Sequence, residues 1–211
     1  MKYLILNLAL FIGSVNCFAQ EKFQTGGYLS FEEYKNHSPS LDNEFIINLR
    51  TASDIRWNGG NDFKVEYPPS DIIRESTKYK IWAICRADTL YINGWRLGLG
   101  MWYTHALTKG RYICMEGGIP GLPQLQKELR KNGSYRPVGG IVTLGKPFQY
   151  NAIRFLYVFD TSNNMVNVLD EKNILKILEP EPDLVRSFKS EPEVNKEIYL
   201  KYIELLNKKF K

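Results

Sequence analysis

Short segments in which apolar and polar residues alternate recur along the middle of this chain, and they restrict its fold more than any other feature. In residues 63–67, Phe-Lys-Val-Glu-Tyr, every second side chain is apolar, so that one face of an extended strand can be buried. Turn residues such as Asn58-Gly59-Gly60-Asn61 and Ala87-Asp88 separate such segments. The pattern predicts strands over residues 44–51, 62–67, 79–86, 89–93, 101–107, 111–115, 152–159 and 165–169. We therefore expect an antiparallel, β-rich domain.

Helical patterns flank this β-rich region at both ends. Ser30 precedes Phe31-Glu32-Glu33, and a serine followed three residues later by a glutamate is typical of a capped helix start. In the tail, Val194, Ile198, Tyr202, Leu205 and Leu206 form one apolar helix face. Shorter helices are expected at residues 125–131, 174–178 and 184–188. The predicted fold class is α+β, with a short N-terminal helix and a C-terminal helical segment that packs on the sheet.

The first residues have the composition of a secretory signal peptide. A mostly apolar run from Tyr3 to Val15 is shorter than the roughly 20 residues that a bilayer-spanning helix needs. Cys17-Phe18-Ala19 offers small residues one and three positions before a cleavage site. We expect residues 1–19 to be removed, so that a single domain over residues 20–211 begins at Gln20. The alternative is a lipid attached to Cys17, which would tether the protein to a membrane.

The charge of the mature chain argues against nucleic acid as a partner. Removal of Lys2 lowers the number of basic residues from 28 to 27 against 23 acidic residues, which leaves a formal charge of +4. These charges are interspersed along most of the chain, whereas a nucleic-acid binder gathers its basic residues into a stripe. No second long apolar stretch follows Gln20, and we therefore expect no transmembrane span after the signal peptide.

Few residues have the spacing of a known catalytic or metal site. His37 and His105 are the 2 histidines, and both lie in contexts typical of structural or solvated side chains. The sequence lacks the phosphate-binding loop, the nucleophile elbow and the paired-histidine motif. We expect no metal and no cofactor. Whether the protein is an enzyme stays open, because carboxylates from distant positions can assemble in the fold, and Asp88 and Glu116 are candidates since they flank predicted strand ends.

Three tryptophans and several glycines offer a candidate binding surface. Trp82 lies in a predicted strand between Ile81 and Ile84, which favours a place in the core. Trp95 and Trp102 lie in a glycine-rich stretch, where they suit either a carbohydrate-stacking platform or core packing, and core packing is the favoured interpretation. The glycines of residues 93–100 favour bulges or a mobile loop over a nucleotide-binding loop.

Cys85 and Cys114 are the cysteines that remain after cleavage, and each lies on a predicted strand. Exported compartments permit disulfides, so that the two could pair if their strands were neighbours. Two buried free thiols explain the same composition and are slightly favoured.

Short motifs in a characteristic order run through nearly the whole chain after residue 26. They are Gly27-Tyr28-Leu29-Ser30-Phe31-Glu32-Glu33-Tyr34, Ser38-Pro39-Ser40, Thr89-Leu90-Tyr91-Ile92-Asn93, Gly110-Arg111-Tyr112, Leu156-Tyr157-Val158-Phe159-Asp160 and Tyr202-Ile203-Glu204-Leu205-Leu206-Asn207. In order and spacing they resemble a family of exported Gram-negative bacterial proteins of unknown function. The resemblance implies export and a single α+β domain, and it assigns no catalytic residue. Members of that family often have a longer glycine-rich apolar stretch than residues 133–145 provide, so a role tied to it, such as membrane association, is not implied here.

Two functional hypotheses from different classes follow. The first is a non-catalytic module of the cell envelope that presents its sheet, or the loops between Gly94 and Gly121, to an envelope protein or a glycan. The second is a periplasmic or secreted hydrolase that uses carboxylates such as Asp88 or Glu116. The first is favoured, and the sequence leaves periplasmic, outer-membrane-associated and secreted locations open.

Overall fold

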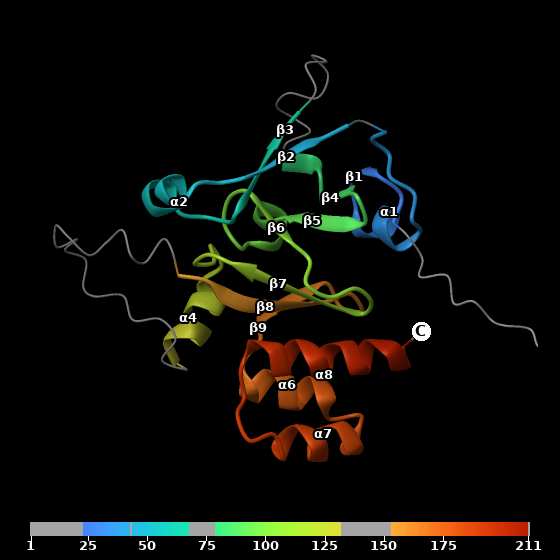
Figure 1. Ribbon diagram of the computed structural model, residues 1–211, viewed down its shortest axis with the longest axis vertical. Helices are drawn as coiled ribbons and strands as arrows, with labels where there is room; N and C mark the ends of the chain where they lie inside the picture. Colours follow the sequence, from blue (N-terminus) through green and yellow to red (C-terminus); the bar gives the residue numbers. More distant parts are fainter. Residues whose placement is uncertain (1–22, 43, 68–78, 132–152, 211) are drawn as a thin grey trace, which may run out of the picture.

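The computed structural model describes residues 23–42, 44–67, 79–131 and 153–210. Within these ranges the chain forms three layers, which are a six-stranded sheet, a three-stranded sheet and a group of helices (Figure 1). The fold class is therefore α+β, as the sequence predicts. The expected signal peptide at residues 1–19, the lipid site at Cys17 and the glycine-rich residues 133–145 lie outside the described residues. No helix in the described part of the chain is long and apolar enough to cross a bilayer.

The six-stranded sheet is antiparallel throughout and has the strand order β1-β4-β5-β6-β3-β2. Its strands are β1 (Gly26–Tyr28), β2 (Ile46–Leu49), β3 (Phe63–Glu66), β4 (Ala83–Arg86), β5 (Thr89–Asn93) and β6 (Tyr103–His105). Ala87 and Asp88 both have positive φ, 48° and 61°, which matches the tight turn predicted between β4 and β5. Helix α1 (Phe31–Lys35) follows β1, and Ser30 caps it by accepting a hydrogen bond from the Glu33 amide at 3.2 Å.

The three-stranded sheet consists of β7 (Tyr112–Gly117), β8 (Phe155–Asp160) and β9 (Met165–Val168). Side chains on β7 alternate between two cores: Ile113 and Met115 join the core shared with the six-stranded sheet, whereas Tyr112 and Cys114 join the core under the helices. Because successive strand side chains point to opposite faces, a sheet that is covered on both sides needs apolar residues at nearly every position. This requirement explains the almost continuous apolar run of β7 and β8.

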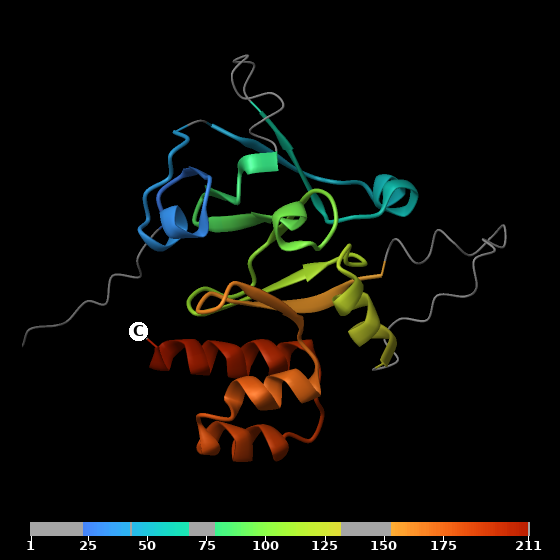
Figure 2. The same ribbon diagram turned by 180° about the vertical axis from the view of Figure 1, so that it is seen from behind.

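The helical layer covers the far side of the three-stranded sheet, as both views show (Figures 1 and 2). It contains α6 (Glu171–Leu178), α7 (Pro182–Lys189) and α8 (Lys196–Lys209). The predicted docking of the tail helix is confirmed, although its buried face differs in detail. Ile203 is buried and Leu205 is partly exposed, so the true stripe runs through Tyr202, Ile203 and Leu206.

Four features differ from the sequence-based expectation. Helix α2 (Ala52–Asn58), capped by Thr51, lies between β2 and β3 where only a turn was expected. The predicted strands at residues 101–107 and 111–115 form β6 and β7, which belong to different sheets and meet at one isolated bridge between Ala106 and Met115. Residues 81–82 precede β4, although a strand is predicted over residues 79–86. Residues 94–97, where bulges or a mobile loop are predicted, form a short 3-10 helix, η1 (Gly94–Leu97). Helix α4 (Pro123–Lys131) agrees with the prediction at residues 125–131.

A side-chain amide holds the last helix to the second sheet. Asn207 on α8 is buried, and its Oδ1 accepts a hydrogen bond from the Tyr112 amide while its Nδ2 donates to the Tyr112 carbonyl, each at 2.8 Å. The Asn207 amide thus satisfies the backbone groups at the first residue of β7, as a neighbouring strand would.

Asn207→Leu keeps the volume of this side chain and removes both hydrogen bonds. Because it leaves the buried Tyr112 N–H without a partner, while the Tyr112 carbonyl keeps its hydrogen bond from Thr108 Oγ1, we expect the free energy of unfolding to fall by about 2 kcal/mol. Urea denaturation followed by circular dichroism measures this loss. Lys208→Leu, at the exposed neighbouring position, should change the free energy of unfolding by less than about 0.5 kcal/mol. Equal effects of the two substitutions would show that the amide does not anchor α8.

Candidate functional site

An aromatic cleft opens where β3 and β6 separate. β3 pairs with β2 over four register positions but with β6 only at Phe63 and Tyr103. Beyond that pair lies a cleft of about 500 Å³, within the size range of ligand pockets, roughly 300 to 1,000 Å³. The residues that line it are Lys64, Val65, Tyr67, Tyr79, Asn93, Trp95, Met101, Trp102 and Tyr103. We refer to these residues as the aromatic cleft.

Large side chains of the aromatic cleft face solvent. The exposed fractions are 50% for Tyr79, 59% for Trp95 and 44% for Met101. The Tyr79 and Trp95 rings lie 6.1 Å apart between centroids and are inclined by 64°, so that their faces form a corner. Exposed rings gathered at a concave surface are more typical of a binding site than of a core that failed to close.

Trp102 is held in an unusual backbone conformation at the base of the cleft. Its φ is +67°, which is rare for a bulky side chain and persists only where the surroundings impose it. The Arg50 guanidinium lies 3.6 Å from the centroid of the Trp102 ring. The backbone at Gly60 also packs closely against the Trp102 ring, because a Cβ added at Gly60 would lie 2.6 Å from Trp102 Cε3. The indole is therefore fixed before any ligand arrives.

Arg50 is itself locked in place. Its Nη1 donates to the Gly59 carbonyl at 2.7 Å, and its Nε donates to Asp54 Oδ2, also at 2.7 Å. The hydrogen bond to Arg50, followed by one from Asn58, lowers the pKa of the Asp54 carboxyl. The carboxylate of Asp54 is thus engaged in supporting the cleft, because it holds the cation that lies under Trp102.

Asn61 fixes the loop that carries Trp95, Met101 and Trp102. Its side chain is fully buried, and Nδ2 donates to the carbonyls of Leu99 and Trp102, each at 3.3 Å. The side-chain Oδ1 accepts a hydrogen bond from the Gly118 backbone N–H at 3.1 Å, and the backbone N–H of Asn61 donates to the Met101 carbonyl at 2.9 Å. One residue thus connects the β2–β3 region, the loop after β5 and the end of β7.

Two phenol groups supply polar atoms inside the aromatic cleft. The hydroxyls of Tyr67 and Tyr103 are 3.1 Å apart and share one hydrogen bond. Burial raises the pKa of both residues, which keeps the phenols neutral at physiological pH. Because two hydroxyls have two protons and only one is used between them, the pair retains a donor and acceptor lone pairs for a ligand.

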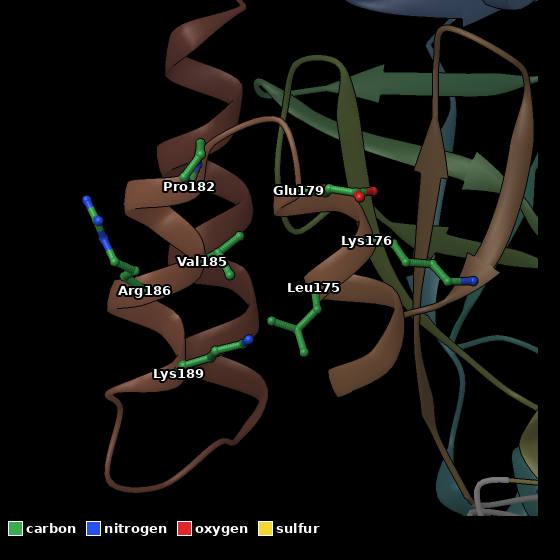
Figure 3. Close-up of a pocket in the computed structure, with 7 residues that line it drawn as sticks. All are labelled: Leu175, Lys176, Glu179, Pro182, Val185, Arg186 and Lys189. Atoms are coloured by element: carbon green, nitrogen blue, oxygen red, sulfur yellow. The ribbon is translucent and has the colours of Figure 1, made fainter.

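A second depression lies between α6 and α7 and is more open. It is lined by Leu175, Lys176, Glu179, Pro182, Val185, Arg186 and Lys189. Figure 3 shows Leu175 and Val185 facing the gap between the two helices, while the ends of Lys176 and Arg186 point away from it. No aromatic ring contributes to the described lining, and Arg186 pairs with Asp183 on its own helix. The aromatic cleft is therefore the stronger candidate site.

The carboxylates proposed for hydrolysis lie in separate ion pairs. Asp88, in the β4–β5 turn, is 2.9 Å from Lys109 Nζ, and Glu116, on β7, is 2.7 Å from Lys196 Nζ. The two residues belong to different sheets, and neither lines the aromatic cleft or the depression between α6 and α7.

The two cysteines are free thiols on opposite sides of the second sheet. Cys85 belongs to the core between the two sheets, and Cys114 to the core under the helices. A disulfide between them would require the layers to rearrange, since β7 and β8 separate the two cores. Burial raises the pKa of Cys85 to about 11 and that of Cys114 to about 12, so both stay protonated at neutral pH.

The histidines do not gather with other metal-binding side chains. His37 stacks on Phe23 at 4.9 Å between centroids, and His105 packs edge-on against Phe63. Within the described ranges there is no group of three or more His, Cys, Asp or Glu side chains that could hold a metal ion.

The favoured interpretation of core packing is confirmed for Trp82 and is wrong for Trp95, whose side chain is 59% exposed because it lies in the loop after β5. Trp82 is buried in the core between the sheets, whereas Trp95 and Trp102 line the aromatic cleft. Sequence patterns did not identify Lys64, Tyr67, Tyr79 or Arg50 as part of a site. These residues come together only because of the strand order, which places β3 beside β6.

The model of a family of unknown function, DUF6563, matches residues 26–209. The chain belongs to this family. The match spans every strand and helix described above, so the aromatic cleft lies wholly within the family domain. No curated protein and no solved structure matches the chain.

Asn61→Ala tests whether the buried amide supports the cleft of this DUF6563 domain. The substitution leaves the Gly118 amide and the Leu99 carbonyl without their partners, while the Trp102 carbonyl keeps its hydrogen bond from the Gly94 amide, so we expect the free energy of unfolding to fall by about 3 kcal/mol. We also expect faster hydrogen exchange at Gly118 than in the wild type. Asn48→Ala, at an exposed position on β2, is the matched control and should lower the free energy of unfolding by less than about 0.5 kcal/mol. Unchanged stability and exchange in Asn61→Ala would contradict this role.

Proposed function

We propose that the protein is an exported, non-catalytic binding module of the cell envelope, and that its aromatic cleft binds a glycan. The observation that carries the proposal is a fixed cleft with exposed aromatic rings. Such rings are unfavourable in water, and a rigid concave support for them is consistent with retention for binding.

The chemistry of the cleft suits a sugar. A pyranose ring has faces of C–H groups and a rim of hydroxyls, so it can stack on a flat aromatic ring while its rim hydrogen-bonds to polar atoms. The Tyr79 and Trp95 rings provide two inclined faces, and the Tyr67–Tyr103 hydroxyl pair provides a donor and acceptors. Tyrosine and tryptophan also lose little conformational entropy on binding, because they have only two side-chain torsions.

Two further observations support a binding role over hydrolysis. The described lining of the cleft contains no carboxylate, whereas hydrolysis of the carboxylate-based kind requires carboxylates near the substrate. The carboxylates that the sequence suggests for hydrolysis are held by lysines elsewhere. Export is supported by the signal-like composition of residues 1–19, and an envelope glycan is a ligand that an exported protein meets.

Trp95→Ala removes one face of the proposed site. We expect the affinity for envelope polysaccharide to fall by about tenfold, which corresponds to the roughly 1.4 kcal/mol of a good aromatic contact. Electrophoresis of the native protein through gels that contain soluble polysaccharide from a Gram-negative envelope gives a dissociation constant from the retardation.

Trp57→Ala is the matched control. Trp57 on α2 has an exposed fraction of 65%, close to the 59% of Trp95, but it does not line the cleft. The wild type and Trp57→Ala should be retarded equally. Equal retardation of Trp95→Ala and the wild type, or no retardation of the wild type by any envelope polysaccharide, would contradict the proposal.

A further inference from the structure

One charged side chain contributes to the described lining of the aromatic cleft, and it is a cation. Lys64 lies on β3, and every other described lining residue is neutral. Its side chain makes no ion pair within 4.0 Å with another described residue. An exposed lysine at the edge of a set of aromatic rings therefore has its ammonium group available to a ligand.

Acidic groups around Lys64 have partners of their own, and Asp62, two residues before it, pairs with Arg154. The Asp54 carboxylate, which interacts electrostatically with Lys64, accepts hydrogen bonds from Arg50 Nε and Asn58 Nδ2 at 2.7 and 2.6 Å. Glu66, two residues further along β3, accepts from Asn48 Nδ2 at 2.9 Å. Arg50, under Trp102, is paired with Asp54 and does not line the cleft, so the charge that a ligand meets on the described lining is that of Lys64. Because Lys64 is the one charged residue of the described lining, the lining itself is suited to an anion.

From this arrangement we infer that the bound glycan is acidic and that Lys64 pairs with a carboxylate on the sugar that stacks in the cleft. The inference rests on the proposed function, because it needs the rings to hold the sugar. A cationic ligand would be repelled by Lys64, and aromatic sites for ammonium groups gain from the absence of such a cation. A carboxylate completes the site with a charge-assisted hydrogen bond.

Because Lys64 is exposed, the pair contributes modestly and is screened by salt. An exposed ion pair is worth up to about 1 kcal/mol, which corresponds to a roughly fivefold change in affinity. Raising the salt concentration to about 0.5 M should remove most of this preference, since the screening length falls below the size of the cleft.

Two pairs of probes isolate the carboxylate and distinguish its source. The first pair is the disaccharide N-acetylglucosaminyl-N-acetylmuramic acid and N,N′-diacetylchitobiose, which differ by one lactyl ether. The second is trigalacturonate and its carboxyl-reduced form. Isothermal titration calorimetry with the purified full chain measures each dissociation constant at low and high salt. We expect the acidic member of at least one pair to bind about fivefold more tightly than its neutral partner at low salt.

Variants separate this inference from the proposed function. Lys64→Met should abolish the preference for the acid, and Lys64→Arg should retain it. Lys35→Met, at an exposed position on α1, should behave as the wild type. Trp95→Ala should weaken binding of the acidic and the neutral sugar alike.

The inference is overturned if acidic and neutral sugars bind equally in both pairs, if the preference survives Lys64→Met, or if no probe binds. Equal binding that still depends on Trp95 would overturn the acidic preference and leave the glycan site standing. Whether the cleft binds a glycan at all is tested separately, by the retardation of the wild-type protein in gels that contain envelope polysaccharide.

Discussion

The buried side chain of Asn61 is the contact on which the shape of the cleft depends. It joins three parts of the chain that are far apart in sequence, because it bonds to Leu99, Trp102 and Gly118. A buried amide is stable only when its donors and acceptor are satisfied, so the loop after β5 must approach β3 and the end of β7 in one arrangement. Space is as restricted as hydrogen bonding, since a Cβ at Gly94 would lie 2.0 Å from Asn61 Nδ2.

This arrangement places strain where the proposed ligand binds. Trp102 adopts a left-handed φ, and its ring packs closely against Arg50 and Gly60. Backbone strain of this kind is unfavourable by about 1 to 3 kcal/mol, and the surrounding contacts must offset it. The contacts that impose this conformation also fix the Trp102 ring, so that the ring need not move when a ligand binds. A preformed site loses less entropy when it binds a ligand, and this would favour the proposed binding of a sugar.

Most local structure could be predicted from the sequence, whereas the division into two sheets could not. The alternation at residues 63–67 and the turn at Ala87-Asp88 correctly indicate β3 and the β4–β5 hairpin, because these are local signals. The apolar runs of β7 and β8 give no indication that one face meets a sheet and the other meets helices. Helix α2 was missed because residues 44–51 were assigned to a strand up to Thr51, and that threonine is the cap of the helix. The pairing of β3 with β6, which creates the cleft, depends on contacts between distant residues and left no local pattern.

The central claim is that a preformed aromatic cleft binds a glycan, and the indole resonances test it most directly. The chain has 4 tryptophans, of which Trp95 and Trp102 line the cleft, Trp82 is buried and Trp57 is exposed on α2. In a nitrogen–proton correlation spectrum of the labelled protein titrated with envelope polysaccharide fragments, the indole signals of Trp95 and Trp102 should shift together. Those of Trp57 and Trp82 should stay in place. Shifts of Trp57 alone, or no shift at any indole at saturating glycan, would contradict the account.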